Sequence, residues 1–471
     1  MHEGPLKRRQ NSLVTFRSLD PLSGVADLKP HSNEARLSGR RNANTTPEAR
    51  LRSFWAQLKA HPLSRVGPGL ITGAADDDPS GIATYSQAGA QFGLNMLWTM
   101  PLAFPLMAAI QSMCGRIGRV TGRGLAANIK TAFPPNVLKG VVLLLLIANT
   151  LNIAADVAAM GEVGELVSGF DRHVMTGVFV ITTLLLQIFV PYHRYVFFLK
   201  WLTLSLLAYA AVLFTVHVPW GEVAVRTVWP HLELNSTTAA VIVGVFGTTI
   251  SPYLFFWQAS EEVEDMFREQ GTPLLEDPVA APQELRRIQW DTWSGMLYSD
   301  ITAYFIILAT AVTLNVAGVT DIETAAQAAS ALRPLAGDFA FLLFALGIVG
   351  VGLIGVPVLA GSAAYALAEA MDWREGLEQR AADARGFYGV IAVSVLAGLL
   401  IQYSPISPMK ALFWSAVING VVAVPLMVVI ILLASKASVM GAYTCGRSIV
   451  ILGWIATLVM GLAAVRMFVP G

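Results

Sequence analysis

Three consecutive aspartates, Asp76 to Asp78, stand inside an apolar stretch at about 68–92, and Pro79-Ser80-Gly81 follows them directly. A carboxylate at the centre of a bilayer costs about 3 kcal/mol on insertion scales, so the cluster indicates a functional site. The proline and glycine predict a helix break, whose freed backbone groups must line a cavity or contact other protein. Carboxylates at such a break are typical of a cation site in a transporter. A loop outside the membrane or a helix N-cap is the alternative interpretation.

A second apolar stretch, at about 237–260, is interrupted by Gly244-Val-Phe-Gly-Thr-Thr-Ile-Ser-Pro-Tyr253. The first and sixth spans are equivalent positions if spans one to five and six to ten form inverted repeats. Paired breaks at such positions indicate a binding site at the interface between the repeats. Taken alone, a Ser-Pro step in a membrane helix is more often a simple kink. We predict broken helices near residues 76–81 and 247–253.

The composition indicates an all-α polytopic membrane protein. Only 14% of the 471 residues are charged and 55% are hydrophobic, whereas soluble domains carry about 25% charged residues. Many apolar segments are long enough to cross a bilayer as a helix. We predict one transporter domain, residues 67–471, with eleven spans. The expected spans are 68–92, 95–115, 137–168, 174–191, 195–217, 237–260, 290–317, 338–370, 386–402, 407–435 and 446–469.

Residues 1–66 are predicted to form a disordered, basic, cytoplasmic arm, because they carry twelve Lys or Arg residues, five acidic residues and no long apolar run. If the eleven spans alternate across the membrane, 27 of the 32 Lys and Arg residues fall on the side of this arm. An excess of Lys and Arg marks cytoplasmic loops. We therefore expect a multi-pass protein of the plasma or inner membrane with its N-terminus in the cytoplasm.

The reactive residue types narrow the chemistry further. Cys114 and Cys445 are the only cysteines, which argues against a disulfide framework or a cysteine metal centre. All seven histidines fall in the arm, in predicted loops or near helix ends, so none is expected to act deep in the membrane. An intramembrane aspartyl protease needs Gly-x-Gly-Asp, and the nearest match, ending at Asp338, lacks the first glycine. We predict a monomer that contacts the lipid bilayer, needs no cofactor, binds no nucleic acid and is not an enzyme.

Several motifs resemble those of the NRAMP family of divalent-metal transporters, and the resemblance covers about residues 65–435. The similar segments are Gly67-Pro-Gly-Leu70, Asp78-Pro79, Gln87-Ala-Gly-Ala-Gln-Phe-Gly93, Arg116-Ile-Gly-Arg-Val-Thr-Gly122 and Gly247-Thr-Thr-Ile-Ser-Pro252. The resemblance implies a LeuT-like fold, with two inverted five-helix repeats and here an eleventh helix. It also implies a divalent metal ion as substrate.

The sequence departs from the family pattern at the implied metal site. The ligating aspartate is kept as Asp78, but Gly81 stands at the position of a ligating asparagine. Ser251 replaces a methionine whose sulfur binds the metal, and Thr248 takes the position of a backbone carbonyl ligand. The same losses are found in a subgroup of NRAMP-related magnesium transporters. The predicted metal-site residues are Asp78, Ser80, Gly81, Thr248 and Ser251.

These replacements favour a hard, partly hydrated cation. A thioether favours softer transition metals, and a hydroxyl removes that preference. Gly81 is expected to open volume beside Asp78, which would suit Mg²⁺, an ion that keeps several waters and needs only one or two carboxylates. We therefore expect transport of Mg²⁺ and also Mn²⁺. The conventional family activity, proton-coupled Mn²⁺ and Fe²⁺ transport, is the alternative, and a LeuT-fold transporter of organic cations is the rival class.

Proton coupling is expected to be weak or absent. Gln258 stands where the family has a histidine implicated in proton movement, and Ala159 replaces one of two acidic residues, leaving Asp156. A relay requires protonatable groups linked by hydrogen bonds. Asp76 and Asp77 could take over this role, because adjacent carboxylates repel each other and favour keeping a proton. The predicted path or accessory residues are Asp76, Asp77, Asp156, Gln258 and Asn419.

Overall fold

The computed structural model describes residues 68–190, 204–233, 235–377, 379–401 and 406–469, which contain helices and no β-strand. The predicted basic arm lies outside these residues. The α-helices are α2 (Pro68–Asp76), α3 (Pro79–Phe92), α4 (Thr99–Thr121), α5 (Leu125–Ala132), α6 (Pro135–Ser168), α7 (Arg172–Phe189), α9 (Leu207–Val212), α10 (Trp220–Val228), α11 (Ser236–Thr249), α12 (Pro252–Arg268), α13 (Ala281–Thr310), α14 (Ala325–Ala329), α15 (Arg333–Ala336), α16 (Ala340–Met371), α17 (Arg385–Ile401), α18 (Pro408–Ser435), α19 (Ala437–Met440) and α20 (Arg447–Phe468). Short 3₁₀ segments span Gly93–Met96, Leu204–Leu206, Ser330–Leu332, Gly337–Phe339 and Gly441–Tyr443, and a π-helical turn, Ala311–Asn315, follows α13.

The first apolar stretch is broken between α2 and α3. Asp78 adopts an extended conformation at the N-cap of α3, and its side chain accepts a hydrogen bond from the backbone N–H of Gly81. Pro79 follows at the first helical position, where its missing N–H is not needed and its fixed φ suits a helix start. The residue before a proline is disfavoured in the helical region. The sequence Asp-Pro therefore ends one helix and starts the next at the same point.

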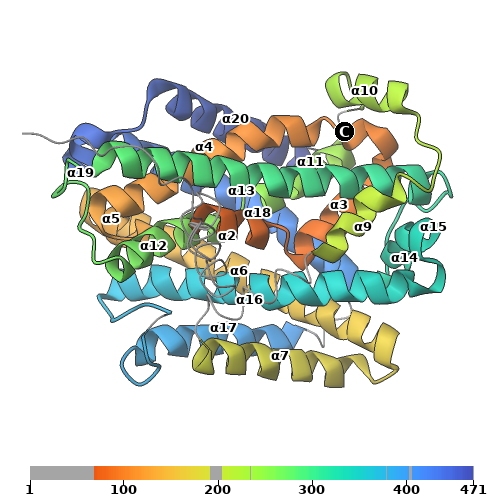
Figure 1. Cartoon of the computed structure of the whole chain (residues 1–471), viewed down its shortest axis with the longest axis horizontal. Coiled ribbons are helices and arrows are strands. Elements are labelled where there is room, and N and C mark those ends of the chain that lie inside the picture. The colour runs from red at the N-terminus through yellow and green to blue at the C-terminus, as the bar shows by residue number, and fades with distance from the viewer. Residues whose placement is uncertain (1–67, 191–203, 234, 378, 402–405, 470–471) are drawn as a thin grey trace, which may run out of the picture. The chain divides into compact units, whose positions relative to one another are not determined.

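The second break separates α11 from α12. Ser251 has an extended conformation, and Pro252 opens α12 in the way that Pro79 opens α3. At the other end of α11, the side chain of Asn235 accepts a hydrogen bond from the N–H of Thr238 and caps the helix. The half-helices pack in pairs, because α3 contacts α11 and α2 contacts α12. Figure 1 shows α2 and α3 among the long helices α13, α16 and α18.

Seven helical segments of the described residues are long and apolar enough to cross a membrane, or eight if one sharply bent pair forms a single span. The pair is Pro79–Met96 with Thr99–Thr121, which bends by 113°. The sequence-based prediction of eleven spans is higher because it includes apolar segments whose helices are too short, or too incompletely described, to be counted as spans in the structure. Segment 68–92 is divided by its break, the apolar helix Arg385–Leu399 is short, and segment 195–217 lies partly outside the described residues.

The short helix α2 is held directly against α13 by two glycines. A Cβ atom on Gly69 would lie 2.6 Å from the backbone N of Thr292, and one on Gly73 would lie 2.2 Å from the carbonyl oxygen of Gly295. The side chain of Asp291 also accepts a hydrogen bond of 2.7 Å from the N–H of Gly69, one of the free donors at the start of α2. Small residues allow this close backbone approach between membrane helices.

We expect Gly73→Ala to destabilise the protein by about 1–3 kcal/mol, because the added methyl group forces α2 away from α13. Gly140→Ala on α6 is the matched control, since a Cβ there meets no atom within 4 Å. Thermal unfolding of both variants in detergent tests this prediction. Equal melting temperatures for the two variants would contradict the close contact.

Candidate metal-ion site

Asp78 is the residue around which the candidate site is built. Its carboxylate is buried, and one oxygen, Oδ1, accepts hydrogen bonds from the Ser80 hydroxyl at 2.7 Å and the Gly81 N–H at 2.8 Å. Both donors belong to the first turn of α3. The partial positive charge at a helix N-terminus also favours a carboxylate at this position. The helix break therefore fixes the orientation of Asp78 and partly compensates its buried charge.

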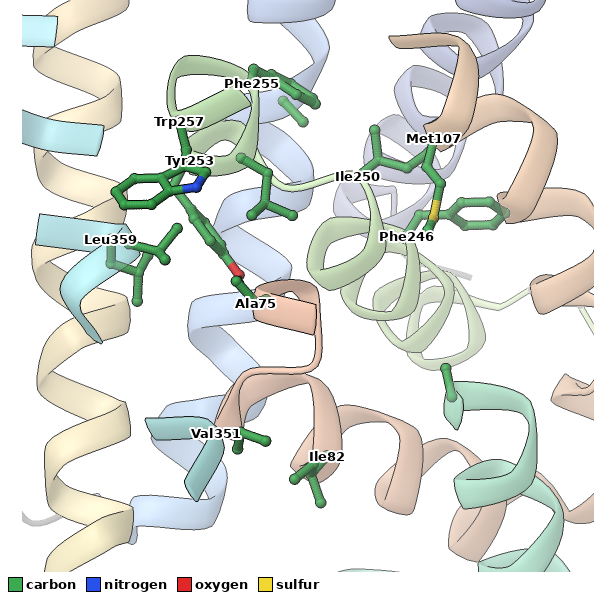
Figure 2. Close-up of a cluster of buried hydrophobic side chains, with 14 of the residues drawn as sticks. Ala75, Ile82, Met107, Phe246, Ile250, Tyr253, Phe255, Trp257, Val351 and Leu359 are labelled. Carbon is green, nitrogen blue, oxygen red and sulfur yellow. The ribbon is translucent and has the colours of Figure 1, made fainter. Parts of the chain in front are cut away.

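The second oxygen of Asp78 faces α6 and α12. Asn152 donates from Nδ2 to Oδ2 at 2.9 Å, and the Tyr253 hydroxyl lies 3.2 Å from the same oxygen. The Tyr253 hydroxyl is also 3.2 Å from the carbonyl oxygen of Ala75, so its single proton serves one of the two acceptors at a time. Figure 2 shows Tyr253 directed from α12 toward Ala75 at the end of α2. The two broken helices thus meet through this tyrosine.

The extra volume expected beside Gly81 is not present. A Cβ on Gly81 would lie 3.1 Å from Thr248 Oγ1 and 3.3 Å from Cε2 of Tyr85, so these side chains occupy the space of the absent asparagine. Thr248 is buried, and its hydroxyl has no hydrogen-bond partner. It is therefore the hydroxyl of Thr248 that faces Gly81 across the two breaks. A buried neutral oxygen without a partner is suited to a hard cation.

Ser251 is buried, but its hydroxyl is turned back toward α11. It lies 2.8 Å from the carbonyl oxygen of Gly247 and 2.6 Å from that of Thr248. These are among the carbonyls that the end of α11 leaves without a helical partner. In this conformation Ser251 stabilises the helix break and makes no hydrogen bond to Asp78. Its sequence position at the second break is adjacent to the site.

A row of polar side chains extends the site along α6 toward α18. Asn152 Nδ2 lies 3.4 Å from Asp156 Oδ2, and Asn419 Nδ2 lies 3.4 Å from Asn152 Oδ1. Asp156 Oδ1 and Asn419 Oδ1 are buried and have no hydrogen-bond partner. Asp156 and Asn419, both predicted accessory residues, are thus linked to Asp78 through Asn152. Their free oxygens could bind a cation or the water that accompanies it.

The other predicted accessory residues lie elsewhere. Asp76 and Asp77 face α13, where both contact the hydroxyl of Ser299. Gln258 accepts a hydrogen bond from Thr72 at 2.6 Å and lies 3.3 Å from Glu262, so both ends of its amide are engaged. Gln258 on α12 is therefore hydrogen-bonded to Thr72 on α2, and neither of these two hydrogen bonds involves Asp78.

Three residues of the site were not in the predicted set. Asn152 and Tyr253 bind the carboxylate of Asp78, and a Cβ on Gly355 of α16 would lie 3.1 Å from Cβ of Asp78. Asn152 precedes Asp156 by four residues and so shares its helix face, a signal available from the sequence. Glycines in an apolar helix such as α16 indicate close helix packing in general. Nothing in their spacing shows that Gly355 makes room for Asp78.

The donor set is dominated by neutral oxygens around one carboxylate. No group of three or more His, Cys, Asp or Glu side chains in the described residues is arranged to hold a metal ion. Of the described histidines, His173 lies in the first turn of α7, and His217 and His231 lie between helices. One or two carboxylates with hydroxyl, amide and water oxygens are the ligands that hard divalent cations accept, whereas thiolate and imidazole ligands suit transition metals.

Solved structures of transporters share this fold. The Eremococcus coleocola manganese transporter superposes with a TM-score of 0.68 at 15% identity, covering 88% of this chain and 86% of that one. MhsT in complex with L-phenylalanine gives 0.60 at 12% identity, over 85% of this chain and 98% of that one. Helices broken in pairs and neighbours of this kind define an all-α polytopic membrane protein with the LeuT fold, which confirms the predicted fold class.

The particular family follows from the sequence. The model of the family described as "Natural resistance-associated macrophage protein-like" matches residues 69–470, so the chain belongs to the Nramp family. Members of this family are membrane transporters and not enzymes. A relative, the divalent metal cation transporter MntH of Acidiphilium cryptum, is 25% identical over 87% of this chain and 93% of its own length. MntH of Klebsiella pneumoniae is 24% identical over 84% of this chain and 92% of its own length.

Away from Asp78, three glutamates gather where α12 and α16 end. Glu369 accepts a hydrogen bond from the N–H of Ala127 at 2.9 Å, and Glu264 accepts one from the N–H of Leu377 at 2.8 Å. Glu375, in the loop after α16, has a buried oxygen without a hydrogen-bond partner. Burial, followed by repulsion from Glu369 and Glu264, raises the pKa of Glu375 to about 9. Glu375 is therefore protonated at neutral pH.

We expect Glu375→Gln to stabilise the protein at pH 8 and to leave its stability almost unchanged at pH 4.5. Because the folded-state pKa of Glu375 is raised, the unfolded chain releases this proton at lower pH than the folded protein does. Its effect on stability therefore becomes more unfavourable as the pH rises from about 4.3 toward 9. Melting temperatures at both pH values test this, with Glu222→Gln on the exposed side of α10 as the control. A shift that is the same at both pH values would contradict the assignment.

Proposed function

We propose that this chain is a divalent metal cation transporter that binds its substrate at Asp78, between the two broken helices. The single observation that carries the proposal is the buried Asp78 carboxylate, which is held by Ser80, Gly81, Asn152 and Tyr253 with no cationic side chain among its partners. A carboxylate at this depth is stabilised when a cation binds it. The names of the MntH relatives support the same substrate class.

We further propose that Mg²⁺ and Mn²⁺ are the favoured substrates. The side chains nearest Asp78 offer oxygen: Ser80, Asn152, Thr248 and Tyr253. Such a site does not discriminate against Mg²⁺ in the way that a thioether ligand does. Because Thr248 and Tyr85 fill the space beside Gly81, the selectivity argument rests on the type of ligand and not on added volume.

Weak or absent proton coupling is part of the proposal. Ala159 and Gln258 cannot carry a proton, and both ends of the Gln258 amide are engaged by Thr72 and Glu262. Entry would then be driven by the membrane potential, which contributes about 2.3 kcal/mol per charge per 100 mV. The positive-inside pattern supports a cytoplasmic N-terminus in the plasma membrane.

Proton-coupled Mn²⁺ transport of the conventional Nramp type is the second candidate. One observation favours it: Asp156 is buried beside the site and has an oxygen without a partner. Uptake of Mg²⁺ and Mn²⁺ into proteoliposomes at a negative internal potential, with a pH dye inside, distinguishes the two. Mg²⁺ entry without acidification supports the first proposal. Mn²⁺ entry that excludes Mg²⁺ and carries protons supports the second.

We expect Asp78→Asn to reduce cation uptake by at least about 100-fold, since it removes the negative charge that compensates the ion and retains the side-chain size. Asp338→Asn makes the same chemical change at an exposed position and should transport normally. Initial rates of Mn²⁺ uptake into proteoliposomes of each variant provide the measurement. Normal uptake by a folded Asp78→Asn protein would refute the assignment of Asp78 as the cation-binding residue.

We expect Ser251→Met to raise the ratio of Mn²⁺ to Mg²⁺ uptake on the order of tenfold, equivalent to about 1.4 kcal/mol, because a thioether at the second break favours the softer cation. Ser435→Met at the exposed end of α18 is the control for an added methionine. Competition of Mg²⁺ against Mn²⁺ uptake gives the ratio directly. An unchanged ratio in Ser251→Met, with uptake retained, would show that this position does not contact the ion.

A further inference from the structure

The helix break presents carboxylates in two directions. Asp78 is bound by residues of α3, α6 and α12. Asp76 and Asp77 instead face α13, where the Ser299 hydroxyl lies 2.5 Å from Asp76 Oδ2 and 3.0 Å from Asp77 Oδ1. One hydroxyl proton cannot satisfy both carboxylates, yet their shared contact brings them within reach of a single ion. The two aspartates and Ser299 form a cluster that the site at Asp78 does not use.

Several carboxylate oxygens in and beside this cluster are buried without a hydrogen-bond partner. Asp76 Oδ1 and Asp77 Oδ2 are buried and have no hydrogen-bond partner, and the same holds for Asp300 Oδ1 on α13. The Tyr85 hydroxyl on α3 is also buried without a partner, and it interacts electrostatically with Asp76, Asp77, Asp78 and Asp300. The helix α2 ends at Asp76, so the partial negative charge of its C-terminal carbonyl groups lies beside the cluster. The carboxylates, the tyrosine oxygen and the helix C-terminus are all electron-rich, and no positive charge among the described residues balances them.

One cation at Asp78 does not remove that deficit. Within the described part of the chain, no ion pair involves Asp76, Asp77, Asp78, Asp156 or Asp300. A single divalent ion bound by Asp78 leaves the pair on the α13 side without a partner charge. Buried charges are paired or bind metal ions, because an isolated one is very costly. A second cation would compensate both ionised carboxylates at once.

We propose that Asp76, Asp77 and Ser299 bind a second hard divalent cation, separate from the ion at Asp78 and on the α13 face of the same break. Two carboxylates and a hydroxyl are a ligand set that Mg²⁺ and Mn²⁺ accept, with water or the Tyr85 hydroxyl completing the shell. Because Asp77 and Asp78 are adjacent in the chain, the two ions would repel each other, and occupation of one site would weaken binding at the other. The inference rests on the proposed function, since it assumes a chain that binds divalent cations.

The stoichiometry of Mn²⁺ binding tests this directly. Equilibrium dialysis of the purified full-length chain against radioactive Mn²⁺ should give two ions per wild-type chain and two for the exposed control Asp338→Asn. The double variant Asp76→Asn/Asp77→Asn should bind one ion, and so should Asp78→Asn. Ser299→Ala, a milder change that keeps all the carboxylates, should lower the affinity of one of the two sites by about tenfold. Electron paramagnetic resonance should show spin coupling between the two Mn²⁺ ions in the wild type and in Asp338→Asn, and no coupling in Asp78→Asn or in Asp76→Asn/Asp77→Asn.

The outcomes separate this inference from the proposed function. One ion per wild-type chain, unchanged in Asp76→Asn/Asp77→Asn and Ser299→Ala but lost in Asp78→Asn, would overturn the second site and leave the first intact. Loss of only one of two ions in Asp78→Asn, with transport unaffected, would support the second site and count against transport through Asp78. Two ions without spin coupling would place the second ion elsewhere and refute the inference. No binding by the wild type would refute both.

Discussion

A carboxylate buried among apolar helices must be given partners, and this requirement governs the centre of the structure. Asp78 obtains two of its four donors by ending one helix and capping the next, because the first turn of α3 supplies the N–H of Gly81 and the hydroxyl of Ser80. An intact helix would leave no free N–H at this depth. The same backbone feature therefore divides the span and makes the negative charge tolerable.

The remaining partners of Asp78 come from three other helices. Asn152 on α6 and Tyr253 on α12 bind one oxygen, and Gly355 allows α16 to pack against the Asp78 side chain. A shift of any of these helices changes the site. Both half-helices pack against α13 and α16, while α2 also contacts α12 and α3 also contacts α11 and α18. The two sides of the break are thus tied together by α13 and are also attached to different neighbouring helices.

Neutral side chains fill the space beside Gly81. Thr248 and Tyr85 occupy the space that Gly81 leaves, so the site is narrower than the loss of an asparagine suggests. Ser251 satisfies carbonyls at the end of α11, a role a methionine cannot fill. The hydroxyl of Ser251 thus stabilises the second break, and the proposed preference for hard cations assigns a second role to the same residue.

Local patterns determined a large part of this protein. Asp78-Pro79 and Ser251-Pro252 specify the breaks through capping and proline sterics, which involve only neighbouring residues. Hydropathy identified the long helices, and motifs identified the family. Tertiary packing alone decided that Asp76 and Asp77 face Ser299, that Asn152 and Tyr253 hold Asp78, and that Gln258 binds Thr72. These partners lie on helices far apart in the chain, and the direction of each side chain depends on how the helices are rotated against one another. Rotation is set by the whole contact surface, including glycines such as Gly355 whose role appears only when another helix is placed against them.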